Sequence, residues 1–229
     1  MKAAVYNGTR NLYADMIPAV KSLLINSDVE RVYLLTEDDD FPYPLPDCVE
    51  TINVEGQKWF RHDGPNCGRR WTWMSMMRPA LCHVFPELDR ILFLDVDTIV
   101  LKDISDLWDL PIDECYFAAS MEPLRTTPNF LYTNCGVCLL NLEKLRDGKA
   151  DQIIHALNTK SYRFMEQDAM NEYCQGKIFR MPCEYNSNEW VEPCEDPKLI
   201  HFAGILNWNG RPEVAKFREI SWSEIRGGL

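Results

Sequence analysis

The sequence predicts one α/β domain, residues 1–229, with a mostly parallel central sheet flanked by helices. Short runs rich in Val, Ile, Leu, Phe and Tyr alternate with segments whose apolar residues recur at helical spacing. The length of 229 residues also fits a single domain better than two. Alternating strands and helices are typical of parallel sheets, in which ligands bind beyond the carboxyl ends of the strands.

The expected strands are apolar runs bounded by turn residues. They are Ala3–Tyr6, Arg31–Thr36, Cys48–Val54, Arg90–Asp95, Cys115–Ser120, Gly136–Asn141, Lys177–Met181 and Leu199–Phe202. The expected helices have apolar residues near helical spacing. They are Leu12–Ile25, Arg70–Val84, Asp151–Leu157, Gln167–Cys174 and Glu213–Ile220. Pro79, which has no backbone N–H, is expected to kink the second helix or to mark its true start.

Composition excludes several classes of function. The chain has 24 basic and 35 acidic residues, and this net charge of -11 argues against nucleic acid or an anionic membrane surface as the main partner. No apolar run approaches the roughly 18 residues that span a bilayer, and the start of the chain holds no signal-peptide core, so no integral membrane segment is expected. The nine dispersed cysteines are expected to be free thiols in a cytoplasmic protein.

The most informative segment is the buried-looking strand Arg90–Asp95, which is followed by a second acid, Asp97. Side chains two apart in a strand share a face, so both carboxylates can converge at the sheet's carboxyl edge. Two unpaired carboxylates there are costly, and a hard divalent cation removes that cost. The alternative is a pair of acids that cap the next turn, because an isolated Asp-x-Asp is common by chance.

Further motifs extend this segment into a family resemblance. They are Val5-Tyr6-Asn7-Gly8-Thr9 with Tyr13-Ala14, Phe93-Leu94-Asp95-Val96-Asp97-Thr98-Ile99-Val100, Asn134-Cys135-Gly136-Val137, Glu166-Gln167-Asp168-Ala169-Met170-Asn171, Tyr185-Asn186 and His201-Phe202-Ala203-Gly204. In this order along the chain they resemble the family 8 glycosyltransferases, and several motifs in sequence are more specific than any one alone.

The resemblance implies a GT-A type fold with a Rossmann-like sheet. It implies a nucleotide-binding part at about residues 1–110 and a donor and acceptor part at about residues 111–229. The implied activity is retaining transfer of a hexose from UDP-glucose or UDP-galactose to a hydroxyl of a glycan, a protein or a small molecule. The implied metal is Mn²⁺, with Mg²⁺ as the alternative, since an imidazole that joins two carboxylates favours Mn²⁺.

The same resemblance assigns roles to single residues. Asp95, Asp97 and His201 are the implied metal ligands. Gln167 is the implied positioning or stabilising group for the donor sugar, with Glu166 and Asp168 beside it as further catalytic candidates. The implied nucleotide-sugar contacts are Tyr6, Asn7, Thr9, Tyr13, Arg78, Asp95, Val96, Asn134, Gly136, Gly204 and Asn207. Trp190 and Trp208 are the candidate acceptor contacts.

Two positions depart from the family pattern. Asn207 stands where the family has a Lys that contacts the diphosphate, and an amide brings no charge, so Arg211 is considered as a substitute. Glu166 replaces an Asp, and its longer side chain keeps the carboxylate but moves it. These departures leave two alternatives open: a UDP-sugar-binding module of the same fold with weakened catalysis, and a haloacid-dehalogenase-like phosphatase, which also uses Asp-x-Asp at a strand end.

Overall fold

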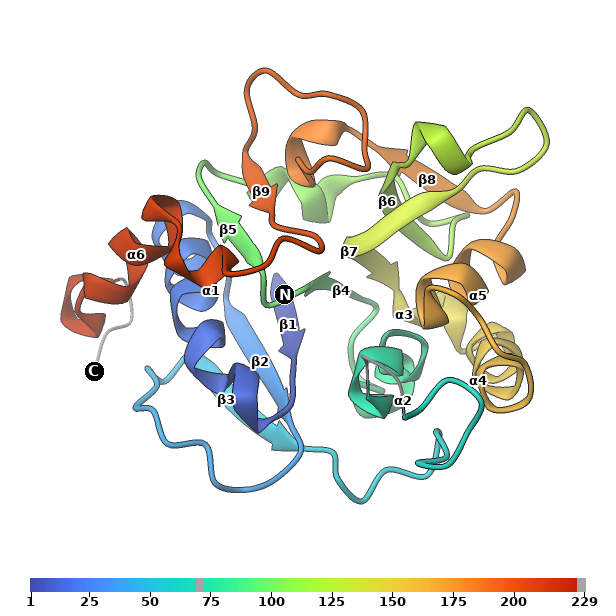
Figure 1. Ribbon diagram of the computed structural model, residues 1–229, viewed down its shortest axis with the longest axis horizontal. Helices are drawn as coiled ribbons and strands as arrows, with labels where there is room; N and C mark the ends of the chain where they lie inside the picture. The colour runs from blue at the N-terminus through green and yellow to red at the C-terminus, as the bar shows by residue number, and fades with distance from the viewer. Residues whose placement is uncertain (69–71, 226–229) are drawn as a thin grey trace.

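The computed structural model describes residues 1–68 and 72–225, which form a central sheet with helices on both faces (Figure 1). Seven strands lie in the order β3-β2-β1-β4-β7-β6-β8. They are β1 (Ala3–Asn7), β2 (Arg31–Thr36), β3 (Val49–Asn53), β4 (Arg90–Leu94), β6 (Phe117–Met121), β7 (Thr133–Asn141) and β8 (Ile178–Met181). A small second sheet pairs β5 (Thr98–Val100) with β9 (Leu199–His201).

The helices are short except for the first. They are α1 (Tyr13–Asn26), α2 (Leu81–Val84), α3 (Leu142–Leu145), α4 (Lys149–Thr159), α5 (Met165–Tyr173) and α6 (Pro212–Glu219). None of the helices in the described part of the chain has the length and hydropathy needed to cross a bilayer.

The expectation of a mostly parallel sheet is confirmed. Strand β1 pairs in parallel with β2 and β4, β2 pairs in parallel with β3, and β6 pairs in parallel with β8. Strand β7 runs antiparallel to both of its neighbours, β4 and β6. The connection from β6 to β7 contains only a short helical turn, Pro123–Arg125, so no long helix carries the chain back to the other end of the sheet.

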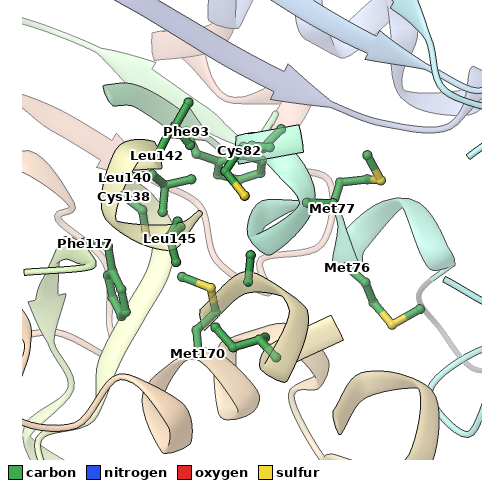
Figure 2. Close-up of a cluster of buried hydrophobic side chains, with 14 of the residues drawn as sticks. Met76, Met77, Cys82, Phe93, Phe117, Cys138, Leu140, Leu142, Leu145 and Met170 are labelled. Atoms are coloured by element: carbon green, nitrogen blue, oxygen red, sulfur yellow. The ribbon is translucent and has the colours of Figure 1, made fainter. Parts of the chain in front are cut away.

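Each strand of the sheet centre contributes side chains to two separate cores, as a sheet covered on both faces requires. In β4, Ile91 and Phe93 face the core beneath α2, α4 and α5, while Leu92 and Leu94 face the core beneath α1. Figure 2 shows part of the first core, which contains Met76, Met77 and Met170 together with side chains of β4 and β7.

The expected helix Arg70–Val84 is wrong over most of its length. Its first residues, 70 and 71, lie outside the described residues, and residues 73–76 and 78–80 form separate 3-10 turns. The α-helix begins only at Leu81, two residues after Pro79. The structure thus agrees with the reading in which Pro79 marks the helix start, because proline cannot donate the backbone hydrogen bond of a helix interior.

The strand β5 is absent from the sequence-based expectation, and it has a structural role. A turn at Val96 and Asp97 separates Thr98–Val100 from β4, so this part of the apolar run leaves the main sheet. It then pairs antiparallel with β9, which places Thr98 opposite His201. Ile99 packs with Phe202, Val214 and Phe217, so α6 supports this small sheet and lies beside α1 (Figure 1).

Candidate functional site

A cleft of about 910 Å³ opens where β1 and β4 end at their carboxyl edges. One part of its wall comes from the first half of the chain, including Asn7, Thr9 and Arg78. The other part comes from the second half, including Asn134 and Gln167. The cleft therefore lies where the general rule for parallel sheets places a ligand.

Asp95, Asp97 and His201 meet in this cleft. One ligand atom from each of them lies within 4.8 Å of the others. The Nε2 atom of His201 is 3.3 Å from Oδ1 of Asp97 and 3.6 Å from Oδ2 of Asp95. Two carboxylate oxygens and one imidazole nitrogen form a donor set that suits a divalent cation of the Mn²⁺ type.

Backbone contacts around these three residues fix the positions of their side chains. Asp97 lies in the turn after β4 rather than in the strand, so the turn, and not strand alternation, directs both carboxylates to one point. The N–H of Asp95 donates to the carbonyl of Gly136 (2.8 Å), and the N–H of Phe202 donates to the carbonyl of Asp97 (2.8 Å). The pairing of β5 with β9 then brings His201 to the acids.

Gly136 leaves the space that the imidazole of His201 occupies. A Cβ atom at residue 136 would lie 2.0 Å from Cε1 of His201 and 2.7 Å from its Nε2. Real side chains do not approach so closely, so a residue with a Cβ would displace the ring. Gly136 is absent from the lining of the cleft, and its part in the site is to admit His201.

Two asparagines orient the imidazole of His201. Oδ1 of Asn186 lies 2.9 Å from Nδ1 of His201, which leaves Nε2 directed at the acids. The side chain of Asn186 in turn donates to Oδ1 of Asn134 (3.0 Å). A hydrogen bond on the far nitrogen is the usual means of fixing a metal-binding histidine.

Arg78 pairs with two acids of the cleft, Asp95 and Glu166. Its side chain is buried, donates to Oδ1 of Asp95 (2.6 Å) and to the carboxylate of Glu166, and lies 4.2 Å from the ring centre of Phe93. The buried guanidinium therefore balances charge that would otherwise be unpaired. Glu166 keeps its carboxylate in the site, although its longer side chain replaces the Asp of the family pattern.

Burial and neighbouring charges shift the pKa values of the three residues in different directions. Burial raises the pKa of Asp95, although Arg78 opposes that shift. Burial also acts to raise the pKa of Asp97, but the charge of His201 outweighs it and the pKa of Asp97 is lowered. Burial acts to lower the pKa of His201, and the nearby Asp97 overcomes this and raises it. The site thus attracts positive charge.

Gln167 is held by hydrogen bonds at both ends of its amide. Its Oε1 accepts from the backbone N–H of Cys135 (3.0 Å), and its Nε2 donates to Glu122 (3.2 Å) and to the hydroxyl of Tyr132 (3.1 Å). Asp168 accepts from that same hydroxyl (2.5 Å). Asp168 does not line the cleft, and Tyr132 lies between it and Gln167 in this chain of hydrogen bonds.

The expected nucleotide contacts divide into two groups. Asn7, Thr9, Arg78, Val96, Asn134 and Gly204 line the cleft. The side chains of Tyr6 and Tyr13 do not: Tyr6 is fully buried and donates to the carbonyl of Ala19, and Tyr13 accepts from the N–H of Glu37. Strand alternation explains Tyr6, because it faces the core beneath α1 while its neighbour Asn7 faces the cleft.

Asn207 also lies away from the cleft lining, in the left-handed region with φ 56°. Arg211, the considered substitute, directly precedes α6 and is not a lining residue either. Among the lining residues that sequence reasoning missed are Glu122 and Arg125. Both follow the carboxyl end of β6, and that position was the available signal.

Comparison with known proteins agrees with this arrangement. The model of the family described as glycosyl transferase family 8 matches residues 39–208. A lipopolysaccharide 1,2-glucosyltransferase of Escherichia coli K12 is 33% identical over 163 residues, which cover 57% of this chain and 48% of that protein. General stress protein A of Bacillus subtilis 168 is 23% identical over 148 residues, which cover 52% of each chain. The chain thus spans about half the length of these curated relatives.

Solved structures show the same fold. The galactosyltransferase LgtC, in complex with donor and acceptor sugar analogs, matches with a TM-score of 0.72 and 16% identity over 99% of this chain and 100% of that one. The glycosyltransferase GlyE of Streptococcus pneumoniae TIGR4 matches with a TM-score of 0.68 and 20% identity over 97% and 61% of the two chains. The fold is therefore the expected GT-A type. Since the family match spans most of the chain and includes the Asp-x-Asp turn and His201, the chain belongs to glycosyl transferase family 8.

Proposed function

We propose that this chain is a metal-dependent, retaining hexosyltransferase that moves glucose or galactose from a UDP-sugar to an acceptor hydroxyl. The observation that carries the proposal is the meeting of Asp95, Asp97 and His201 inside the cleft. Membership of the family supplies the reaction class. The name of the Escherichia coli relative is consistent with glucose, and that of LgtC with galactose.

The donor set of the three residues fits Mn²⁺, because it combines two carboxylate oxygens with an imidazole nitrogen at close range. When bound, such a cation acts as a Lewis acid on the diphosphate that leaves the sugar. The chain itself holds the ligands ready: Asn186 orients His201, and Arg78 fixes Asp95. Mg²⁺ is the alternative, and it prefers oxygen ligands alone.

We assign the remaining lining residues to two parts of the cleft, one for the nucleotide and one for the donor sugar. Asn7 and Thr9, at the carboxyl end of β1, belong to the part of the wall where we place the nucleotide. Gln167, on α5, belongs to the opposite part, where we place the donor sugar. Because both ends of its amide are already held, Gln167 presents a fixed dipole to the sugar and costs little reorganisation during the reaction.

The weakened binding module remains the second candidate, because Asn207 brings no charge and does not line the cleft. The retained triad favours the enzyme, since half-buried acids without a ligand stabilise a fold poorly. The phosphatase alternative receives no support from the family match. We also propose a cytoplasmic location, on the ground that the nine cysteines are free thiols.

The test is hydrolysis of UDP-glucose and UDP-galactose by the purified chain with Mn²⁺, compared with the Asp97→Asn variant. We expect Asp97→Asn to lower turnover by at least about 100-fold, because it removes a charged ligand. Asp47→Asn, a change at an exposed acid that does not line the cleft, is the matched control and should keep full turnover. An active Asp97→Asn variant would contradict the metal assignment. UDP binding without turnover in the wild type would favour the binding module.

A further inference from the structure

Four residues from the second half of the chain form a rim of the cleft that our placement of the nucleotide and the donor sugar leaves unassigned. We define the aromatic rim as Arg125, Arg163, Phe164 and Trp190, all of which line the cleft. The guanidinium of Arg125 lies 3.8 Å from the ring centre of Phe164 and 5.6 Å from that of Trp190. Trp190 is 40% exposed, which is unusual for so large an apolar side chain.

Contacts connect the aromatic rim to the metal triad and to Gln167. The backbone N–H of Trp190 donates to Oδ1 of Asn188 (2.9 Å). Nδ2 of the same Asn188 lies 3.4 Å from Nδ1 of His201. Phe164 precedes α5, the helix that carries Gln167. The rim therefore borders the reacting end of the cleft, while Asn7 and Thr9 lie at the end of β1.

Among the residues that the structure describes, the other charged side chains lining the cleft have partners of opposite charge. Arg78 pairs with Asp95 and Glu166, and Arg125 lies 3.2 Å from the carboxylate of Glu122. Arg163 is exposed, and among residues 1–68 and 72–225 it makes no ion pair, only an approach of 5.2 Å to the ring of Phe164. In a chain with a net charge of -11, an arginine kept unpaired on a cleft wall points to a negatively charged ligand.

We propose that the aromatic rim is the acceptor subsite and that it takes a saccharide carrying a phosphate or carboxylate group. The inference rests on the proposed function, because it assigns the substrate class of the same cleft. Trp190 offers an aromatic face to a sugar ring, and Arg163 offers a guanidinium whose paired N–H groups match the oxygens of either anion. Arg125, whose charge is balanced by Glu122, holds the two aromatic rings in place.

The test is isothermal titration calorimetry on the whole chain loaded with Mn²⁺ and UDP, so that the nucleotide part of the cleft is filled. The probes share one ring: glucose, glucuronic acid and glucose 6-phosphate. We expect at least one anionic probe to bind about tenfold more tightly than glucose, because charge-assisted hydrogen bonds are stronger than neutral ones. A gain for glucose 6-phosphate alone identifies a phosphate, a gain for glucuronic acid alone identifies a carboxylate, and a gain for both identifies a general anion site.

Variants assign the effect to single residues. Arg163→Gln should bring the anionic probes down to the affinity of glucose. Trp190→Ala should weaken all three probes by a similar factor. Lys216→Gln, which removes the same charge from the exposed surface of α6, should leave the anion gain unchanged.

Three results would overturn the inference: equal binding of all probes, no binding of either anionic probe, or an anion gain that survives Arg163→Gln. These results are distinct from failure of the proposed function. If UDP and Mn²⁺ do not bind, the proposed function fails; if they bind and the anion gain is missing, only the acceptor inference fails.

Discussion

The imidazole of His201 lies directly against the backbone of Gly136, so that a Cβ atom there would be 2.0 Å from Cε1 of the ring. The carbonyl of the same glycine accepts a hydrogen bond from the N–H of Asp95 (2.8 Å). One residue of β7 thus positions one acid of the triad through its backbone and admits the histidine through its missing side chain. This contact explains why a glycine outside the cleft lining belongs to the site.

The first prediction concerns Gly136→Ala. The added methyl group should push the ring of His201 away from the acids while the strand pairing of β7 remains. We expect metal-dependent UDP binding to weaken by at least about tenfold, with an overpacking cost of about 1–3 kcal/mol in the free energy of unfolding. Calorimetric titration and urea unfolding measure the two effects. Gly56→Ala, where a Cβ meets nothing within 4 Å, is the control, and an unchanged UDP affinity in Gly136→Ala would contradict the account.

Asn186→Ala should lower the affinity for the metal and should not remove a contact to the donor. Asn186 is fully buried, and its Oδ1 lies 2.9 Å from Nδ1 of His201, so its loss frees the ring to rotate. Loss of such a supporting group lowers metal affinity by about 10–100-fold. The measurement is the Mn²⁺ concentration that half-saturates turnover at saturating donor. If saturating Mn²⁺ restores the maximal rate, Asn186 is a positioning residue; a rate that stays low with unchanged Mn²⁺ affinity would show that this role is wrong.

The Gln167→Ala variant tests whether Gln167 acts on the donor sugar and not on the nucleotide. The amide of Gln167 is held by the backbone N–H of Cys135 and by Glu122 and Tyr132, at the part of the cleft away from Asn7. We expect the turnover number for UDP-sugar hydrolysis to fall by about 100-fold, the scale seen when one preorganised polar group is removed. The dissociation constant of UDP should change by less than about threefold, because only transition-state contacts are lost. A variant that weakens UDP binding and keeps its turnover number would place Gln167 elsewhere.

The fourth prediction tests the support beneath β9. Phe217 on α6 is buried against Ile99 and Phe202, next to the strand that carries His201. Phe217→Ala should lower the free energy of unfolding by about 3–5 kcal/mol, as large-to-small changes in a core do. Urea unfolding checks this value, with Glu219→Ala on the exposed side of the same helix as the control. A loss below about 1 kcal/mol would show that α6 does not stabilise the small sheet.

Sequence periodicity predicted the strands of the main sheet and the longer helices to within a few residues. The strand Arg31–Thr36 is a case in which the expected and observed bounds coincide. Such elements succeed because their apolar spacing alone determines which face is buried. Residues 73–80 failed because buried Met and Trp side chains also recur in irregular 3-10 turns.

The site was predictable to the extent that it lies in local motifs. Asp95, Asp97 and His201 come from such motifs, and the structure brings all three together. The part that could not be predicted depends on tertiary contacts. Strand β5 leaves the sheet to pair with β9, and Glu122 reaches Gln167 from a segment 45 residues away. Neither contact leaves a periodic signal in the chain.

The most direct test of the central claim is thermal stability of the chain with UDP alone, with Mn²⁺ alone and with both. A ligand that binds only the folded state raises the unfolding midpoint by mass action. Because we assign Asp95, Asp97 and His201 to a cation that holds the nucleotide, we predict a large rise only when UDP and Mn²⁺ are present together, and no such rise in Asp97→Asn. The same midpoint for the wild type with and without both ligands would contradict a metal-bridged UDP site.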